Sequence, residues 1–487
     1  MKNRERIIGK AVLDGTLELC SPLLIGSGAQ REGNDVDTQI LQDKEGRPFI
    51  PGTSIAGVLR AALPEDLANL FFGGTVEIST GNGTREVDVQ SAIEIEDVVL
   101  AGKENGKNAD VVARDGVCID DVRGVAVDEK KYDYELVERG ARGAFHAVIT
   151  LREYHRELRP KLADDVERLA SGVVAGFRLG AMTAKGFGHV CVKPLSLDYY
   201  DFAKKEDAIA WLSGDAEHAK ASKHKNMNTQ VKWDKALTGS NFKVDATFAL
   251  TGSLLVKDMD ARMTQPIKGT IVHATMKKSV DSYLVPGPSV KGTLRHHALR
   301  ILEQLGFRDP KKFLNGLMGL DDKAMREAKD WEKKHPDAPK ALRQSRFIVD
   351  EVYINAKTVK PVKQTRNRID RFTGGTINGA LFTTEAVWGN GENAPVHIHF
   401  EIRKAEAADV GLALLLLKDL SLGRLPLGGE KSIGRGVLKG RKAEIRYTLN
   451  EGEQHFTVED GKIVEGDKGK LEECVAALAK KAKEGAA

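Results

Sequence analysis

The sequence predicts a tandem α+β fold made of two copies of one ferredoxin-like, RRM-like module. Two observations lead to this prediction. Short motifs of the first half return in the second half in the same order, and each half follows the element order β-α-β-β-α-β, which is typical of ferredoxin-like domains. The repeat spans a whole domain, so it indicates two duplicated domains rather than a solenoid of short units.

The clearest repeat is a proline–glycine turn that leads into a helix. Residues 50–60 read IPGTSIAGVLR, and residues 285–295 read VPGPSVKGTLR. A second repeat is rich in glycine: residues 180–188 read GAMTAKGFG, and residues 428–436 read GGEKSIGRG, with three glycines at the same offsets. Such spacing within each pair indicates that the two halves share local backbone geometry.

Two further repeats lie between these motifs. Residues 116–124 read GVCIDDVRG and match RNRIDRFTG at 366–374. Residues 93–100 read IEIEDVVL and match FIVDEVYI at 347–354. Chance can produce one such match, but four collinear matches indicate a duplication.

The elements of each half follow from apolar patterning and turn signals. Each half begins with an apolar strand, continues through a turn, a helix, two extended segments and a second apolar helix, and ends with the glycine loop and a closing strand. The first half is expected to place these elements at 11–20, 57–63, 93–100, 144–151, 163–176 and 188–193. The second half is expected to place them at 242–256, 292–302, 346–354, 396–402, 409–423 and 436–440.

The chain of 487 residues is several times longer than an ordinary domain. We expect a first domain at 1–196, a linker with helical pieces at 197–240, a second domain at 241–445 and a polar tail at 446–487 that ends in a helix. The charged run 321–345 is expected to be an exposed helical insertion.

Composition limits the function classes. The net charge of +4 permits an anionic partner without requiring one. The charged start Met1–Lys10 does not resemble a signal peptide, and the longest apolar stretch, Val410–Leu417, is too short to span a bilayer. The four cysteines are scattered and predict reduced, buried, small apolar residues rather than a disulfide frame or a zinc site. A cytoplasmic protein is expected.

The two glycine loops suit a sugar-phosphate backbone, because glycine lets the chain approach a ligand and exposes N–H groups to anions. They match neither a Walker loop nor a Rossmann fingerprint. The alternative is a tight helix-to-strand turn without a ligand; two equally spaced loops with basic residues favour phosphate contact. The candidate residues are Gly180, Lys185, Gly186, Gly188, Gly428, Lys431, Gly434, Arg435 and Gly436.

The helix starts after the proline–glycine turns could also hold phosphate, since a helix N-terminus offers free N–H groups and a positive dipole end. The serines of both turns are expected to cap their helices. The alternative is an ordinary capped helix with its arginine on the surface. The candidate residues are Gly52, Ser54, Gly57, Arg60, Gly287, Ser289, Lys291, Gly292 and Arg295.

Two predicted hairpins, 112–140 and 361–380, form a third candidate region. The second carries Arg366 and Arg368 close to Phe372, and a basic loop with an aromatic residue can stack on bases and contact phosphates. The alternative is a solvated hairpin. The first hairpin is acidic at its corresponding positions, so the two hairpins are not expected to contribute equally.

These motifs together resemble the RAMP superfamily of CRISPR effector proteins, and in particular the backbone subunits of type III complexes. The resemblance is carried by residues 24–60, the IDRFTG segment at 369–374 and the glycine loops. Two such units in one chain resemble two-copy fusions of type III-D variant systems. The resemblance implies a CRISPR RNA guide, a complementary target RNA, other effector subunits as partners, and inserted β-hairpin thumbs that kink the guide–target duplex.

The resemblance also implies that an aspartate in the loop after the first strand cleaves the target RNA, with Mg²⁺ or another divalent cation. Asp37 matches the family's catalytic position, and Asp35 is the reserve. The second unit departs from the pattern: Asp260 is preferred over Asp258, and His273 is a weaker candidate. Asp37 and Asp260 are the expected metal ligands. Without the resemblance, Asp37 is interpreted as a loop aspartate that bonds its own backbone.

Three other interpretations stay open at this point. The chain could be a non-catalytic guide-RNA scaffold, or a CRISPR RNA-processing endoribonuclease that uses histidine as acid or base. His296 and His297 lie beside the second proline–glycine helix, but no paired histidine pattern occurs in both halves. The chain could also be a duplicated ferredoxin-like protein unrelated to RNA.

Overall fold

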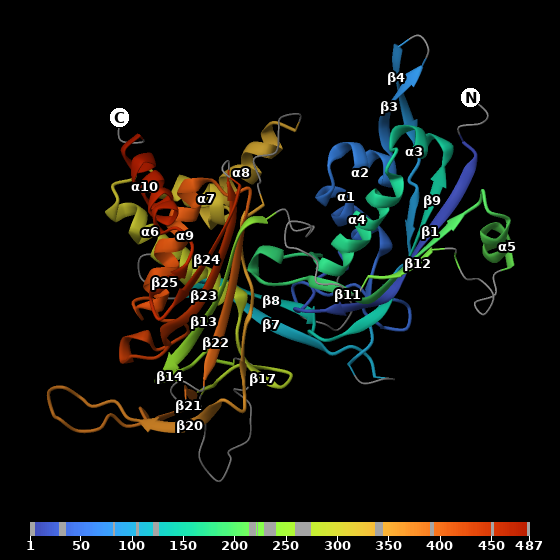
Figure 1. Ribbon diagram of the computed structural model, residues 1–487. Helices are drawn as coiled ribbons and strands as arrows, with labels where there is room; N and C mark the ends of the chain where they lie inside the picture. Colours follow the sequence, from blue (N-terminus) through green and yellow to red (C-terminus); the bar gives the residue numbers. More distant parts are fainter. Residues whose placement is uncertain are drawn as a thin grey trace. The chain divides into compact units, whose positions relative to one another are not determined.

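The computed structural model describes residues 5–28, 36–80, 83–103, 107–119, 126–213, 221, 223–227, 240–258, 274–336, 344–389, 394–449 and 452–484. The chain divides into two compact units, each with its own sheet and helices (Figure 1). The first comprises Met1–Val117, Glu129–Thr183 and Phe187–Gly239. The second comprises Cys118–Asp128, Ala184–Gly186 and Ser240–Ala487.

The elements that run from the N-terminus to residue 226 are β1 (Ile7–Leu19), β2 (Phe49–Ile50), α1 (Gly52–Ala62), α2 (Glu65–Phe72), β3 (Gly74–Thr80), β4 (Gly83–Val89), β5 (Ile93–Ile95), β6 (Val98–Val99), β7 (Val111–Ile119), β8 (Ala126–Val137), β9 (Arg142–Arg152), α3 (Glu153–Leu158), α4 (Leu162–Ala175), β10 (Phe177–Arg178), η1 (Thr183–Lys185), β11 (His189–Asp201), α5 (Lys205–Ser213) and β12 (Lys223–Asn226).

The first unit is built on an antiparallel sheet in the order β10-β11-β1-β9-β5, with β12 added to β11. Along β1, buried residues such as Ala11, Leu13 and Leu17 alternate with polar ones, as expected for a strand with one face in a core. Helices α1 and α4 pack on this sheet and close the core (Figure 1).

The elements from residue 240 onward are β13 (Ser240–Thr251), β14 (Ser253–Leu254), β15 (Ala274–Thr275), β16 (Lys278–Ser279), β17 (Ser282–Val285), α6 (Gly287–Gln304), α7 (Pro310–Met318), α8 (Asp322–Lys334), β18 (Phe347–Val349), β19 (Val352–Asn355), β20 (Val359–Arg366), β21 (Phe382–Gly389), β22 (Pro395–Arg403), α9 (Ala407–Ser421), η5 (Lys431–Ile433), β23 (Val437–Leu449), β24 (Gly452–Glu459), β25 (Lys462–Glu465) and α10 (Lys468–Glu484).

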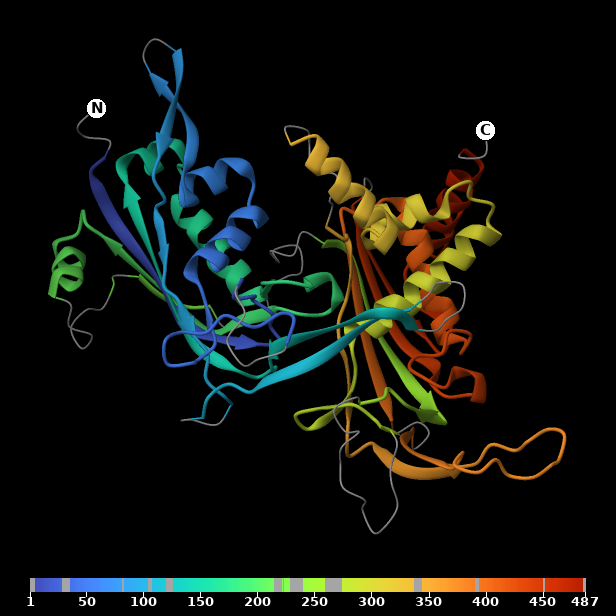
Figure 2. The same cartoon turned by 180° about the vertical axis from the view of Figure 1, so that it is seen from behind.

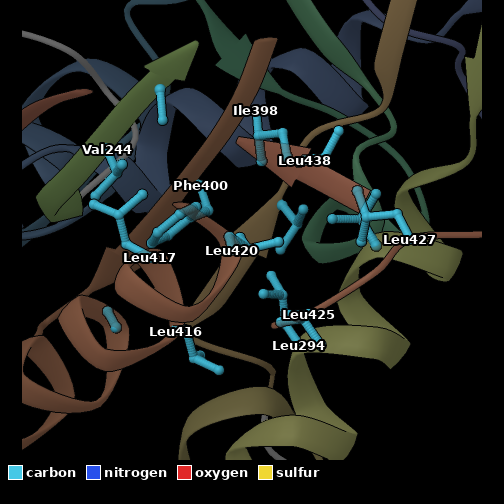
Figure 3. Packing of buried hydrophobic residues seen from close by; sticks show 14 of the residues in the cluster. Val244, Leu294, Ile398, Phe400, Leu416, Leu417, Leu420, Leu425, Leu427 and Leu438 are labelled. Carbon is cyan, nitrogen blue, oxygen red and sulfur yellow. The ribbon is translucent and has the colours of Figure 1, made fainter. Parts of the chain in front are cut away.

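The second sheet has the order β18-β22-β13-β23-β24-β25 and is also antiparallel. Helices α6, α7 and α9 cover one face, and α10 packs on α9 (Figure 1). Val244 and Phe400 from the strands lie beside Leu417 of α9, and Leu294 of α6 lies beside Leu425 in the same core (Figure 3). Burial of these aliphatic and aromatic side chains, at about 1.5–3 kcal/mol each, is the main stabilising term.

The two sheets share one strand order. The first, second, third and fourth strands expected in each half are β1, β5, β9 and β11 in the first unit and β13, β18, β22 and β23 in the second. Both sheets place them in the order second, third, first, fourth. The mixed α/β architecture predicted for both halves is therefore confirmed.

Two segments differ from the expected linker and tail. Strand β11 continues past residue 196 to Asp201, and β12 pairs back onto it, so the linker range begins inside a sheet. Residues 446–484 add β24, β25 and α10 to the second unit. Cys474 and Leu478 of α10 are buried, which is why this polar segment packs instead of extending into solvent.

The structure contains two long two-stranded hairpins: β7–β8, which belongs to the first unit except for Cys118–Asp128, and β20–β21 in the second unit. The loop between β20 and β21 projects from the body of the second unit (Figure 2, orange). Helix α8 lies in the charged run that was expected to be a helical insertion.

Candidate functional site

The loop after β1 is attached to the hairpin β7–β8. The amide of Ser27 donates to the carbonyl of Gln39 at 2.9 Å, which brings the two sides of the loop together. Thr38 then forms a parallel bridge with Tyr134 of β8. Asp37 directly precedes Thr38, so its carboxylate lies at the root of the hairpin.

Asp37 is exposed and is held by a backbone group of the hairpin. Its Oδ2 accepts a hydrogen bond from the amide of Asp133 at 2.9 Å. Burial, together with the nearby carboxylates of Asp115 and Asp37, raises the pKa of Asp133, while Lys131 opposes this effect. The Lys131 ammonium lies 3.3 Å from Asp115. Asp37 is therefore oriented by another strand instead of bonding only its own loop.

The second unit repeats this attachment with different side chains. The amide of Asp258 donates to the carbonyl of Thr275 at 3.0 Å, and Ala274 pairs in parallel with Thr384 of β21. By this register Asp258 corresponds to Ser27, and Ala274 corresponds to the residue after Asp37. The Asp258 carboxylate also forms an ion pair with Lys277 at 3.2 Å.

Asp258 thus does not occupy the position of Asp37 in the second unit. Asp37 directly precedes Thr38, which forms the bridge in the first unit. In the second unit, His273 directly precedes Ala274 in the sequence. His273, Asp260 and Asp35 lie outside the described residues. The register of the described strands, which only the structure supplies, aligns Ala274 with Thr38.

The residues that cap α1 and α6 are not the serines that were expected. Pro51 and Pro286 are the N-cap residues, and among the described side chains none caps either helix. Ser54 and Ser289 lie one turn too far into their helices, where their amides donate to the carbonyls of those prolines. The prediction that the serines cap was therefore wrong. Buried glycines begin both helices, and exposed glycines follow five residues later, namely Gly52, Gly287, Gly57 and Gly292.

A carboxylate already lies at the first helix start. The amide of Gly52 donates to Asp97 Oδ1 at 2.8 Å. An anion at this position is favoured by the helix dipole, and Asp97 supplies it from within the chain. The first amide of α1 is therefore already hydrogen-bonded to a carboxylate of the chain.

Arg60 in the first unit and Arg295 in the second make equivalent hydrogen bonds within their own units. Arg60 donates to Asn69 Oδ1 at 3.0 Å and to the carbonyl of the glycine four residues later. Arg295 donates to Asn315 Oδ1 and, at 2.7 Å, to the carbonyl of the corresponding glycine. The guanidinium groups thus hold the C-terminal ends of α2 and α7, and we leave both arginines out of the proposed RNA interface.

Lys291 points into the core of its unit. Its Nζ donates to Ser345 Oγ at 2.7 Å and to the carbonyl of Phe347 at 2.8 Å. Burial lowers the pKa of Lys291 well below its ordinary value. This ammonium fixes α6 to β18, and we do not count it as an RNA contact; the corresponding residue of the first unit is Ala56.

The glycine loops follow one backbone path. Gly188 and Gly436 have φ of 72° and 78°, and a Cβ atom at either would lie 1.8 Å from the carbonyl oxygen of Leu179 or Leu427. Only glycine fits such an approach. Left-handed φ values also occur at Gly180, Gly186, Gly428 and Gly434. The tight turn that was the alternative interpretation is thus present in both loops.

Met182 and Glu430 both have a left-handed backbone conformation, each with φ of 54°. A left-handed backbone at a residue other than glycine costs free energy and persists only where its surroundings enforce it. Both loops therefore keep a strained residue two positions after their first glycine. In the second loop, an added Cβ at Gly434 would meet no atom of the described residues within 4 Å.

An internal charge network explains the arginines of the second loop. Arg435 is 2% exposed and donates to Glu430, Ser253 and Gln364. Arg366 of β20 donates to the same Glu430 carboxylate. Although burial opposes ionisation, these two guanidinium groups hold the pKa of Glu430 below its usual range. The network connects the glycine loop to the hairpin.

The exposed basic groups lie at the tips of these elements. Lys431 in the glycine loop and Arg368 in the hairpin loop are exposed. Phe372 is 84% exposed, with the Arg371 guanidinium 5.0 Å from its ring centre. Asp370 accepts hydrogen bonds from two amides of this loop and shapes its tip. In the first glycine loop, Lys185 is half-buried, and burial lowers its pKa.

Both units contain a histidine–aspartate pair that sequence reasoning missed. His146 Nδ1 lies 2.6 Å from Asp14 Oδ1 across β9 and β1. His399 Nδ1 lies 2.7 Å from Asp245 Oδ1 across β22 and β13. The pairs occupy corresponding positions, but their members are far apart in sequence. The register of the strands was the signal needed to find them.

The second pair lines a polar pocket of about 520 Å³ together with Tyr353 and Lys442. Desolvation disfavours the charged imidazole, yet the hydrogen bond to Asp245 and the charge of Asp350 raise the pKa of His399. His297, which the sequence had offered as an acid or base, also bonds a carboxylate, that of Asp419, at 2.7 Å.

No group of three or more metal-ligating side chains occurs within the described ranges. Asp37 can therefore offer only one carboxylate, of which one oxygen already accepts an amide hydrogen bond. Mg²⁺ is often held by one or two carboxylates plus phosphate oxygens, and Asp37 can supply one such carboxylate. In the part of the chain that the structure describes, every helix is too short or too polar to cross a membrane.

Comparison with known proteins agrees with this duplicated arrangement. The model of the RAMP superfamily matches two regions, residues 16–191 and 268–439. The CRISPR system Cms endoribonuclease Csm3 of Methanocaldococcus jannaschii is 24% identical over 214 residues, which cover 40% of this chain and 84% of that protein. Since the family model matches most of the chain in two successive regions, this protein belongs to the RAMP superfamily.

Proposed function

We propose that the chain is a guide-RNA-binding backbone subunit of a type III CRISPR effector complex and that its first unit cleaves guide-paired target RNA. In this proposal each unit is a ferredoxin-like RAMP domain with a hairpin thumb, as the shared strand order supports. The observation that carries the proposal is the placement of Asp37 at the root of β7–β8 by the amide of Asp133.

RNA binding is assigned to the exposed tips. Arg368, Arg371 and Lys431 would contact phosphates, and Phe372 would stack on a base. The open backbone at Gly434 admits a sugar-phosphate chain. Such contacts predict strong salt dependence and little sequence preference. Guide RNA, target RNA and other effector subunits are the proposed partners.

The chemistry rests on geometry and one carboxylate. RNA supplies its own nucleophile, and a kinked nucleotide can align the 2′-oxygen with the phosphorus. Asp37 takes the 2′ proton as the O2′–P bond forms and the P–O5′ bond breaks; water then protonates the 5′-oxygen. The products are a 2′,3′-cyclic phosphate and a 5′-hydroxyl. The alternative role for the Asp37 carboxylate is to hold a divalent cation, which would stabilise the negative charge on the phosphate oxygens.

The second unit is proposed to bind RNA without an aspartate at the matching position. Ala274 aligns with Thr38 by its bridge to β21, and His273 precedes Ala274 in the sequence. Asp258 is paired with Lys277. Asp260 remains a prediction that the variants below address. The proposal therefore expects one class of cuts, beside the first thumb.

The test uses the assembled complex with its guide, labelled complementary RNA and Mg²⁺. We expect Asp37→Asn to slow cleavage by about 10²–10⁴-fold while leaving RNA affinity unchanged, since a positioned base contributes a factor of that size. Asp258→Asn, Asp260→Asn and His273→Ala are the matched variants of the second unit. Full cleavage by Asp37→Asn would leave a scaffold role. Loss of a distinct band in Asp260→Asn would instead assign that aspartate.

The duplicated histidine–aspartate pairs favour a second candidate function, guide-RNA processing by acid–base catalysis. An imidazole oriented by a carboxylate through one ring nitrogen can exchange a proton through the other. His146→Ala and His399→Ala would then abolish cleavage of a precursor RNA that contains the CRISPR repeat. His397→Ala is the control, because His397 bonds Thr247 instead of a carboxylate. Unchanged precursor cleavage in both variants would exclude this role.

A further inference from the structure

Two cysteines of the first unit are in contact. Cys20 Sγ lies 3.2 Å from Cys191 Sγ, although the residues are 171 positions apart in the chain. Cys20 directly follows β1 and is exposed, and Cys191 lies in β11 and is half-buried. The prediction that the cysteines are buried was wrong for Cys20, which is exposed. The two thiols also lie together, because antiparallel pairing of β1 and β11 brings them to the same face.

The charges around the pair favour a thiolate on Cys191. The hydrogen bond from Cys20 lowers the pKa of Cys191 to about 7, with further help from Lys193 of β11 and Arg142 of β9, while burial and Glu18 oppose the shift. Arg142 is itself paired with Glu18 at 2.9 Å. A thiol whose pKa lies near the ambient pH is an effective attacking group in thiol–disulfide exchange.

We propose that Cys20 and Cys191 form a redox-active dithiol that closes to an intrachain disulfide by exchange with a small disulfide such as oxidised glutathione. The proposal rests on the contact between the two sulfur atoms and on the exposure of Cys20. It does not depend on the proposed function. Close approach of two thiols favours ring closure over capping of each thiol by a separate molecule.

The reaction balances in two exchanges. The Cys191 thiolate attacks one sulfur of the small disulfide, forms a mixed disulfide and releases one small thiolate, which takes up a proton. Cys20 then loses its proton and attacks Cys191 Sγ. This step forms the Cys20–Cys191 bond and releases the second small thiol. The protein loses two hydrogens and two electrons, and the small disulfide is reduced to two thiols.

The bond would tie the start of the loop that carries Asp37 to the strand that follows the first glycine loop. The amides of Cys20 and Ser21 already donate to the carbonyl of His189. The second unit has no such pair: Thr251 and Lys439 occupy the corresponding positions. The proposed dithiol is therefore specific to the first unit.

The experiment uses the full-length, fully reduced chain, which carries four free thiols. The chain is incubated with oxidised glutathione at pH 8, its remaining thiols are blocked with N-ethylmaleimide, and disulfides are mapped by mass spectrometry. We expect half of the thiols to disappear, with one peptide pair linked through Cys20 and Cys191, and dithiothreitol to restore them. Oxidation should slow markedly when the pH falls below 7, because the thiolate of Cys191 is then protonated.

Three variants make the result decisive. Cys118→Ser/Cys474→Ser keeps the pair and should oxidise like the wild type. Cys20→Ser should instead trap a glutathione adduct on Cys191, which also reports that the variant is folded and reactive. Retention of all four thiols under conditions that oxidise a free dithiol, a link that involves Cys118, or separate glutathione adducts on Cys20 and Cys191 in the wild type would overturn the proposal.

Discussion

Glu430 receives hydrogen bonds from two arginines that the sequence had assigned to RNA. A guanidinium group suits a carboxylate as well as a phosphate, since both accept its paired N–H groups. Arg366 and Arg435 therefore could not be assigned from their positions in the sequence. Glu430, which accepts from both arginines, lies in the glycine loop close to Arg435 in the sequence. An acidic residue so near an arginine indicates an internal ion pair, and sequence reasoning did not use this signal.

The His399–Asp245 pair makes a pH-dependent contribution at the residue scale. The pKa of His399 is raised and that of Asp245 is lowered when the protein folds. The imidazolium contributes stability below its unfolded pKa of about 6.5 and loses it as pH rises through the raised folded pKa. The carboxylate contributes above about pH 4. We therefore expect Asp245→Asn to destabilise the protein by less than about 1 kcal/mol, since Asp245 is largely exposed, and only at mildly acidic pH.

Urea unfolding of the wild type and Asp245→Asn at pH 5.5 and at pH 9 measures this difference. Asp460→Asn is the control, because Asp460 pairs with Arg441, which does not titrate in this range. An equal loss at both pH values for Asp245→Asn would show that the imidazolium does not carry the effect.

At the scale of elements, both units keep the same hydrogen-bonded contact between two consecutive helices. In each unit an arginine of the helix after the proline–glycine turn binds the end of the next helix through an asparagine and a glycine carbonyl. Helix C-termini leave carbonyl groups without intrahelical partners. These arginines satisfy such groups, which explains their repeated spacing without any ligand.

We expect Arg295→Ala to lower the free energy of unfolding by about 1–3 kcal/mol, the cost of leaving partly buried acceptors without a donor. Arg60→Ala is expected to cost less, because the corresponding contacts of Arg60 are exposed. Chemical denaturation followed by circular dichroism measures this loss. Arg300→Ala, an exposed arginine of α6, is the matched control. Unchanged stability together with weaker RNA binding would instead return Arg60 and Arg295 to the RNA interface.

At the scale of the whole molecule, each unit has its own core. The buried cluster of the first unit and that of the second share no residue. Each cluster combines side chains from one sheet and from the helices that cover it. Separate cores allow one unit to loosen while the other remains folded.

Leu169→Ala in α4 and Leu416→Ala in α9 test this independence, because both leucines are fully buried. Each substitution is expected to cost about 2–5 kcal/mol in its own unit. Hydrogen exchange followed by mass spectrometry should then accelerate in one unit only, so each variant is the control for the other. Acceleration throughout the chain in either variant would show that the two units unfold together.

The sequence by itself determined the duplication, the order of the elements and the loop that carries Asp37. These features are local: apolar periodicity, proline–glycine turns and glycine spacing act on neighbouring residues. A helix within the charged run 321–345 and the terminal helix near 469–484 were predicted for the same reason; the structure confirms the first at Asp322–Lys334 and the second at Lys468–Glu484.

Only the tertiary structure decided which side chains meet. Strand pairing placed Cys20 against Cys191, joined each histidine to its aspartate, and aligned Asp258 with Ser27 instead of with Asp37. Pairing register depends on contacts between segments more than a hundred residues apart, and a shift of one residue reverses the face of every side chain. Local patterns do not contain this information, and for that reason the chemical partners had to be read from the fold.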